Sequence, residues 1–357
     1  MRVRSLEAYP VALPFREPYV TSTGTLERRE MVLIRVEDEG GNEGWGDAVP
    51  LSLRGGESLA VVLEQLEAVP VSDLGNEGGA ELAPPAMAAI DTALLDLEGR
   101  RAGTPAWGVL VAYMRREFPG EALPRPVPCN GTLGGGDPAS VAAAAAELAA
   151  AGFHTIKVKV GTGADRERLT AVREAAGPDV KLRIDANGAW DVDRAVEEIT
   201  AIDDEVGLEL AEQPCGDLRE LAAVAERVSV PLVADESVAS SADAGKAMEL
   251  AACDAATLKL AKVGGPREGL RIAATLPSYL SSALDSPLGI AAAVHTAQVL
   301  PGDGFVAGLA HGLATSSLFA DNVAAHEHLS GPEIRAPTAP GLGVEVDRDA
   351  VERLAIR

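Results

Sequence analysis

The chain is poor in aromatic residues, and this shortage limits how its core can be built. Phe, Tyr and Trp together make up 3% of the 357 residues, whereas hydrophobic residues as a whole make up 47%. The core must therefore consist mainly of Ala, Val, Leu and Ile, which suits buried parallel strands and the helices that cover them. The hydrophobic content also excludes general disorder. Because a chain of this length exceeds the size at which a single core usually stops growing, we expect two domains.

Positive charge, cysteine and long apolar runs are also scarce. The 31 Lys and Arg residues face 54 Asp and Glu residues, which gives a formal net charge of −23. Such a chain repels phosphate backbones and anionic membrane surfaces, so neither nucleic acid nor a membrane is expected as a partner. No apolar run reaches the length of a membrane span, and no signal-peptide core follows Arg2 and Arg4. The three cysteines form no CxxC pair, which favours reduced thiols in a cytoplasmic protein. The oligomeric state stays open.

Two patterns of secondary structure follow one another along the chain. Residues 1–124 show strands first and helices afterwards, which is typical of an α+β domain. In residues 125–320 helix and strand alternate with short loops, which predicts an α/β fold, a modified (β/α)7β TIM barrel, with its last strand at 304–307. We expect the tail, residues 321–357, to return to the N-terminal capping domain and complete it, with a short strand at 343–346.

Five short motifs place a lysine or a carboxylate at the end of an apolar run. They are Lys157-Val158-Lys159, Asp185-Ala186-Asn187, Glu212-Gln213-Pro214, Asp235-Glu236-Ser237 and Lys259-Leu260-Ala261-Lys262. Successive motifs lie about 25 residues apart, close to the roughly 30 residues of a βαβ unit. Parallel strands would therefore deliver a lysine, three carboxylates and a lysine to the C-terminal rim of the barrel, where the chemistry of TIM barrels takes place.

The three carboxylates predict a metal site. Asp185, Glu212 and Asp235 would repel one another on a crowded rim unless a cation lay between them. Their hard oxygen ligands suit one divalent cation, Mg²⁺ first and Mn²⁺ second. Taken singly, each acid could instead cap the following helix or pair with a nearby base, since acids at helix starts are common. Their regular spacing between lysines favours the metal interpretation.

The lysines predict proton transfer. Lys157 and Lys159 are two positions apart on a strand, so both side chains project to the same face. If that face is the barrel interior, mutual repulsion and burial would lower a lysine pKa and make the group a base; the alternative is an exposed edge with solvated lysines. We expect Lys259 to face Lys159 across the carboxylates, and Lys262 to be a solvated loop residue. Together these features indicate metal-assisted proton abstraction beside a carboxylate.

The KxK, DAN, EQP and DES motifs, with the lysine before Gly264-Gly265, resemble the enolase superfamily and specifically its muconate lactonizing enzyme subgroup. The resemblance covers nearly the whole chain, including the segment from Glu43 to Asp47. A lysine base with an Mg²⁺-stabilised enediolate is a pattern of that superfamily. Within the subgroup, the sequence Leu-Ser-Ser-Ala-Leu-Asp-Ser-Pro-Leu-Gly at 280–289 is most similar to the o-succinylbenzoate synthase family.

That resemblance implies a lyase reaction of menaquinone biosynthesis, the dehydration of 2-succinyl-6-hydroxy-2,4-cyclohexadiene-1-carboxylate to 2-succinylbenzoate. Lys159 would remove the proton α to the ring carboxylate of this small anionic substrate and then protonate the departing hydroxide. Lys259 would stay charged over the ring face, and Lys157 would tune the pKa of Lys159 and contact the carboxylate. The resemblance further implies that Asn187 and Glu236 orient the metal ligands or Lys159, and that substrate is bound by Arg183, Ser281 and Ser282.

Other functions fit the same motifs. An N-succinylamino acid racemase or a dipeptide epimerase of the same superfamily would use Lys159 and Lys259 as opposed bases on the two faces of its substrate. A non-catalytic barrel used as a binding module would predict at least one missing acid or base, and none is missing. The segment 15–24, rich in Ser and Thr, fits either a loop that closes over the site or an ordinary turn between two strands.

Overall fold

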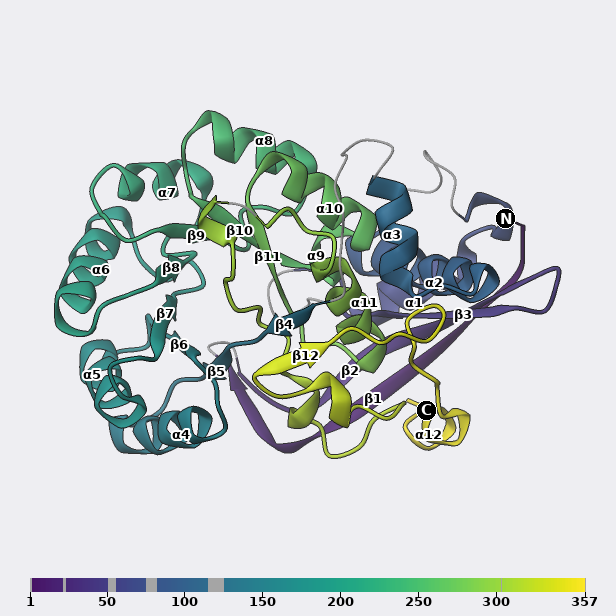
Figure 1. The fold of residues 1–357 in the computed structure, drawn as a ribbon, viewed down its shortest axis with the longest axis horizontal. Coiled ribbons are helices and arrows are strands. Elements are labelled where there is room, and N and C mark those ends of the chain that lie inside the picture. The colour runs from purple at the N-terminus through teal and green to yellow at the C-terminus, as the bar shows by residue number, and fades with distance from the viewer. Residues whose placement is uncertain are drawn as a thin grey trace.

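The computed structural model of the chain describes residues 2–21, 24–50, 56–74, 82–114, 125–302 and 304–356. Within these ranges a cap of antiparallel strands and helices lies beside a curled parallel sheet that helices surround (Figure 1). None of the helices in these ranges is both long and apolar enough to cross a membrane. This is the expected arrangement of a capping domain and a modified TIM barrel.

The cap is a three-stranded antiparallel sheet in the order β1-β2-β3, with helices packed on it. Its elements are β1 Val3–Thr21, β2 Gly24–Asp38, β3 Glu43–Ala48, α1 Leu59–Ala68, α2 Pro84–Ala102 and α3 Ala106–Met114. Helix α2 begins with prolines in its first turn and ends at Gly103 in the left-handed conformation, as helix start and stop signals require. A Cβ at Gly44 of β3 would lie 2.2 Å from the carbonyl oxygen of Ala93. Glycine therefore lets β3 lie directly against α2.

The segment 15–24 is not a loop over most of its length. Strand β1 continues to Thr21 and pairs with β2 as far as Gly24, while Ser22 and Thr23 lie outside the described residues. The ring of Phe15 is buried and stacks on Phe319 with centroids 4.9 Å apart. This stacking contact fastens the hairpin to the segment that follows the barrel.

Seven parallel strands form the barrel sheet in the order β11-β10-β9-β8-β7-β6-β5. They are β5 Gly131–Leu133, β6 Thr155–Lys159, β7 Lys181–Asp185, β8 Leu210–Glu212, β9 Leu232–Ala234, β10 Ala255–Lys259 and β11 Ser278–Ser281. The helices are α4 Pro138–Ala150, α5 Asp165–Ala176, α6 Val192–Val206, α7 Leu218–Ala225, α8 Ser241–Glu249, α9 Leu260–Val263, α10 Pro266–Thr275 and α11 Pro287–Ala297. In α6 the buried residues recur at helical spacing, namely Ala195, Ile199, Ile202 and Val206, so one apolar face covers the sheet.

The barrel closes a few residues later than the sequence predicts. The strand expected at 304–307 is wrong, because Gly304–Val306 forms a turn of 3₁₀-helix. Closure comes from a short bridging segment in which the His311 N–H donates to the Pro128 carbonyl at 2.7 Å and the Gly312 N–H donates to the Leu280 carbonyl at 2.8 Å. Val306 packs with Leu309 in a buried cluster at the barrel, so its burial does not require a strand.

The C-terminal tail returns to the cap. The Ala12 N–H donates to the Leu354 carbonyl, and the Ile356 N–H donates to the Pro10 carbonyl, both at 2.9 Å. The tail also contains α12 Arg348–Arg353 and β12 Glu333–Arg335, which pairs with β4 Pro126–Pro128. The strand expected at 343–346 is wrong. Gly341 and Gly343 have positive φ angles, which interrupt an extended segment, and Val346 makes only an isolated bridge to Ala324.

Candidate active site

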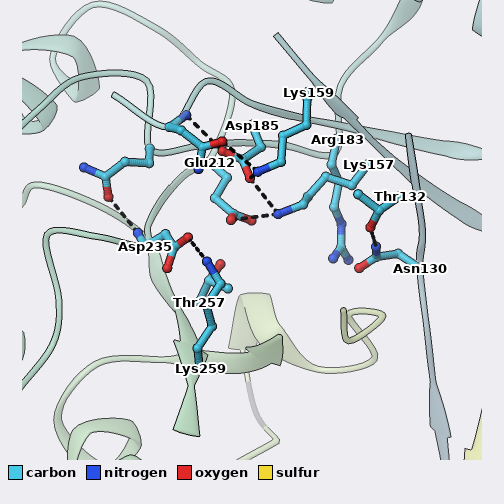
Figure 2. Close-up of polar contacts among 12 residues, drawn as sticks. Asn130, Thr132, Lys157, Lys159, Arg183, Asp185, Glu212, Asp235, Thr257 and Lys259 are labelled. Atoms are coloured by element: carbon cyan, nitrogen blue, oxygen red, sulfur yellow. Dashed lines mark hydrogen bonds and ion pairs between the residues drawn. The ribbon is translucent and has the colours of Figure 1, made fainter. Parts of the chain in front are cut away.

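The five motifs meet at the C-terminal ends of neighbouring barrel strands (Figure 2). In the parallel register Lys159 of β6 lies beside Asp185 of β7, and Asp185 lies beside Glu212 of β8. Asp235 follows β9 directly, and Lys259 is the last residue of β10. The regular βα spacing therefore places a carboxylate triad, Asp185, Glu212 and Asp235, between two lysine-bearing strands.

Lysine ammonium groups hold the triad from one side. The Nζ of Lys157 lies 2.8 Å from Oδ2 of Asp185 and 2.8 Å from Oε1 of Glu212. The Nζ of Lys159 also contacts Oδ2 of Asp185, and it donates to Oδ1 of Asn187 at 2.7 Å. Both lysines thus project to the same interior face, and Lys157 is 6% exposed, which excludes the solvated strand edge.

The charges of this cluster stabilise one another. Burial alone would lower the pKa of Lys157, but the carboxylates of Asp185 and Glu212 raise that pKa well above its usual value. Burial alone would likewise raise the pKa of Asp185, but Lys157 and Lys159 hold that pKa well below its usual range. For Lys157 the two nearby anions therefore outweigh the effect of burial on its pKa.

A second pair of lysines holds the other end of the triad. Lys259 contacts Oδ2 of Asp235, and Lys262 donates to Oδ1 of Asp235 at 2.8 Å and to the Thr257 carbonyl at 3.2 Å. The solvated position expected for Lys262 is wrong, since this residue is 9% exposed. The chain turns into the short helix α9 directly after β10, and residues three apart on a helix lie on one face. That spacing is the signal in the sequence that could have placed Lys262 beside Lys259.

Two residues in the left-handed conformation follow the strand ends and brace the triad. Asn187, with φ 46°, donates its N–H to Oδ1 of Asp185 at 3.0 Å and its Nδ2 to Glu236 at 2.9 Å. Gln213, with φ 39°, accepts the N–H of Asp235 at 2.7 Å. Strained backbone of this kind gathers at functional sites. The contacts of Asn187 and Glu236 suit the orienting role predicted for them, which stays a prediction. The sequence alone does not assign a role to Gln213, although this residue lies inside the EQP motif.

The residues predicted to bind substrate have protein partners. Arg183 is fully buried, pairs with Glu209 and donates to the Ala310 carbonyl at 2.7 Å. The Ser282 hydroxyl donates to Oδ2 of Asp285 at 2.7 Å and accepts the N–H of Leu284 at 2.9 Å. Ser281 is 9% exposed. These positions lie in the barrel or at its rim, and their contact with substrate stays a prediction.

The motifs in the sequence do not identify Tyr279 as a residue of the site. Its hydroxyl donates to Oε2 of Glu212 at 2.8 Å, and its ring lies below the guanidinium of Arg183. The sequence offers a weak signal for it, because Tyr279 and Ser281 are two positions apart on one strand and share a face.

The donor set fits a divalent metal ion. The described ranges contain no group of three Asp, Glu, His or Cys side chains that already converges as a metal cage. Instead, three buried carboxylates are balanced by ammonium groups on long, flexible side chains. All the acidic donors are oxygens, which are the ligands that Mg²⁺ prefers. Asp185, Glu212 and Asp235 are the residues that would hold such an ion.

Comparisons with known proteins find relatives of similar sequence and fold. The chain is 34% identical over 319 residues to the hydrophobic dipeptide epimerase of Enterococcus faecalis, covering 83% of this chain and 87% of that one. The crystal structure of the N-succinyl Arg/Lys racemase of Bacillus cereus superposes with a TM-score of 0.90 at 25% identity, covering 100% and 99% of the two chains. The o-succinylbenzoate synthase of Thermobifida fusca is 42% identical over 191 residues, 52% of this chain and 59% of that one.

Family models match both parts of the molecule. Residues 4–110 match the model of the mandelate racemase / muconate lactonizing enzyme N-terminal domain. Residues 140–350, more than half of the chain, match the model described as enolase C-terminal domain-like. The chain is therefore an enzyme of the enolase superfamily and belongs to its muconate lactonizing enzyme subgroup.

Proposed function

We propose that the protein moves a proton at the α-carbon of a carboxylate, as a racemase or epimerase of N-acylated amino acids such as N-succinylamino acids and dipeptides. One observation carries this proposal. Lys159 on β6 and Lys259 on β10 flank the three strands that bear Asp185, Glu212 and Asp235 (Figure 2). A substrate held over the triad would have one lysine on each face, which is what a change of configuration requires.

Asp185, Glu212 and Asp235 would hold Mg²⁺, the ion present with the dipeptide L-Leu-L-Tyr in a crystal structure of the Enterococcus faecalis epimerase, which superposes with a TM-score of 0.84 at 29% identity. When bound, such an ion would supply positive charge against the substrate carboxylate while negative charge builds up there. The anionic groups of the substrate would also meet the excess of lysines at this rim.

The lysines have different parts in this reaction. Asp185 and Asn187 fix the Nζ of Lys159, so this nitrogen is positioned to take the α-proton on one face. Lys259, fixed by Asp235, would return a proton on the opposite face. Lys157 serves neither step, because its buried Nζ is held between Asp185 and Glu212, and it would instead contribute positive charge beside the substrate carboxylate.

The racemase proposal has broader support than the synthase expected from the sequence. The epimerase and racemase relatives match 83% to 100% of this chain, whereas the Thermobifida fusca synthase matches 52% of it. The synthase remains the second candidate because its identity of 42% is the higher value within that shorter span. In that case Lys159 would act alone on one face, and the reaction would be the dehydration of menaquinone biosynthesis.

One paired assay distinguishes the two. Purified enzyme with Mg²⁺ in D₂O receives either an N-succinylamino acid or the cyclohexadiene substrate of the synthase, and both tubes are followed by NMR. Deuterium at the α-carbon with loss of optical rotation in the first tube alone supports the racemase. Aromatic product in the second tube alone refutes it in favour of the synthase. Product in both tubes supports a racemase with dehydratase activity, and product in neither refutes the synthase and the racemisation of N-succinylamino acids.

A further inference from the structure

We infer that Tyr279 is a positioning residue that makes the metal site prefer Mg²⁺ to larger cations by holding one oxygen of Glu212. The inference rests on the proposed function, because it assumes that the triad binds a divalent ion. It concerns a residue that the motifs do not include and that lies below the reacting groups.

The two oxygens of each carboxylate in the triad have different hydrogen-bond partners. One oxygen accepts from a fixed protein donor: the Asn187 N–H for Asp185, the Tyr279 hydroxyl for Glu212 and the Lys262 ammonium for Asp235. The other oxygen contacts the ammonium of Lys157, Lys159 or Lys259. This second set consists of Oδ2 of Asp185, Oε1 of Glu212 and Oδ2 of Asp235, and these are the oxygens that a metal ion would share.

Tyr279 is held rigidly in this arrangement. It is 2% exposed and packs in a buried cluster that includes Leu210 and Leu309. The guanidinium of Arg183 lies 5.1 Å from the centre of its ring, and Arg183 is itself held by Glu209. The hydroxyl therefore cannot follow Glu212 if that carboxylate turns, and it keeps Oε2 away from the other two acids.

Because Tyr279 holds one oxygen of Glu212, this residue can offer only its other oxygen to the metal, and this favours a small ion. Mg²⁺ demands a compact octahedral shell, whereas Ca²⁺ takes six to eight oxygens and often uses both oxygens of a carboxylate. Without the Tyr279 hydroxyl, Glu212 could turn both oxygens toward the ion. Such a change would weaken the ordering that Mg²⁺ needs and would relax the discrimination against Ca²⁺.

Among the three fixed donors, the Tyr279 hydroxyl is the one that a conservative substitution removes without changing charge or backbone. Tyr279→Phe keeps the ring and its contact with Arg183. Tyr113→Phe is the matched control, because Tyr113 also lies below an arginine, Arg267, at 5.8 Å and its hydroxyl accepts from Arg271 at 2.9 Å, far from the triad on α3.

The test is calorimetric titration of the substrate-free enzyme with Mg²⁺ and separately with Ca²⁺. For Tyr279→Phe we expect the Mg²⁺ Kd to rise about tenfold and the Ca²⁺ Kd to change less than about threefold, with Tyr113→Phe unchanged. The ratio of the two constants describes only folded molecules, so partial unfolding cannot imitate the effect. Saturating Mg²⁺ should then restore most of the kcat of Tyr279→Phe.

Other results contradict the inference. Equal changes in both constants, or no change in either, would remove the role of Tyr279 in metal preference while leaving the proposed function intact. A kcat that stays low at saturating Mg²⁺ would also overturn a purely positioning role. Failure of the wild-type enzyme to bind Mg²⁺ would instead refute the metal site, and with it both proposals.

Discussion

Lys159 and Lys259 hold different carboxylates of one buried triad: Lys159 contacts Asp185, and Lys259 contacts Asp235. The two lysines are not equivalent, since the Lys159 side chain is 22% exposed and that of Lys259 is 8% exposed. Lys159 is therefore the more accessible of the two proposed bases. This asymmetry makes the two lysines separable by mutation.

Lys159→Ala and Lys259→Ala should each lower kcat for racemisation by at least about a hundredfold, because each removes the proton carrier of one face. In D₂O, Lys259→Ala should still exchange the α-proton of one enantiomer through Lys159 without racemising it. Chiral chromatography and NMR measure the two outcomes, with Lys246→Ala on α8 as control. Near-normal racemisation by Lys159→Ala would contradict its role as base.

Removal of the metal ion should abolish activity, because lysine ammonium groups alone would then have to balance the negative charge of the substrate carboxylate. Added Mg²⁺ at one hundred times its Kd should stabilise the wild-type enzyme by about 3 kcal/mol of unfolding free energy, and its Tm should rise accordingly. Asp235→Asn should lose this response, since it removes one of three charged ligands. Thermal scans with a chelator and with graded Mg²⁺ measure the effect.

The surface variant Asp204→Asn serves as the control for the loss of one negative charge. A rise in Tm of equal size in Asp235→Asn and Asp204→Asn would show that Mg²⁺ binds elsewhere on this acidic protein.

The sequence could predict the barrel and the triad because both follow from a repeated local rule. A βα unit has a nearly constant length, so residues such as Asp185 and Glu212 that end apolar runs at that interval must share one rim. A second local rule, the alternation of side chains along a strand, predicts that Lys157 and Lys159 point to one face. No long-range information was needed for these positions.

The remaining features depend on contacts between distant segments. Closure at His311 and Gly312 uses two backbone hydrogen bonds to residues 128–130 and two to residues 280–282, and so short a segment leaves no alternating pattern in the sequence. The position of Tyr279 against Glu212 depends on how two strands that are not neighbours curl toward each other across the barrel. Burial of Lys262 depends on α9, a single turn of helix whose sign in the sequence is the three-residue spacing of Lys259 and Lys262.

A carboxylate at the junction of cap and barrel should contribute a loss of stability as the pH rises. Asp47 of β3 accepts the Ser286 N–H at 2.9 Å, and burial, followed by the charge of Asp285, raises the pKa of Asp47 to about 7 from its ordinary 3.8. Burial raises the pKa of Asp285 as well, although the hydrogen bond from the Ser282 hydroxyl opposes this. A raised folded pKa contributes stability below 3.8 that is lost as the pH rises through about 7.

Asp47→Asn should therefore remove part of this loss. Relative to the wild type, the variant should gain on the order of 2 kcal/mol in unfolding free energy between about pH 5 and about pH 8. Urea denaturation at the two pH values measures the difference, with the exposed Asp179→Asn as control. The same pH dependence in Asp47→Asn and wild type would contradict the assignment.

Gly289 of α11 allows Asp47 of the cap to approach the start of α11, and substitution of this glycine should push the two apart. A Cβ at Gly289 would lie 2.7 Å from the Cβ of Asp285 and 2.8 Å from Oδ1 of Asp47, and the former atom is fixed to the backbone and cannot move aside. We expect Gly289→Ala to cost about 1–3 kcal/mol of unfolding free energy through overpacking. Gly245→Ala is the control, since Gly245 lies within helix α8 and a Cβ there would meet no atom within 4 Å.

The two glycine variants should change stability in opposite directions. Gly245→Ala should stabilise the protein by about 0.4–1 kcal/mol, because alanine reduces the conformational entropy of the unfolded chain without a clash. Chemical denaturation of both variants under the same conditions measures the sign directly. If Gly289→Ala were as stable as Gly245→Ala, the approach of Asp47 to the start of α11 would not be close enough to require glycine, and the junction would be held by contacts other than this one.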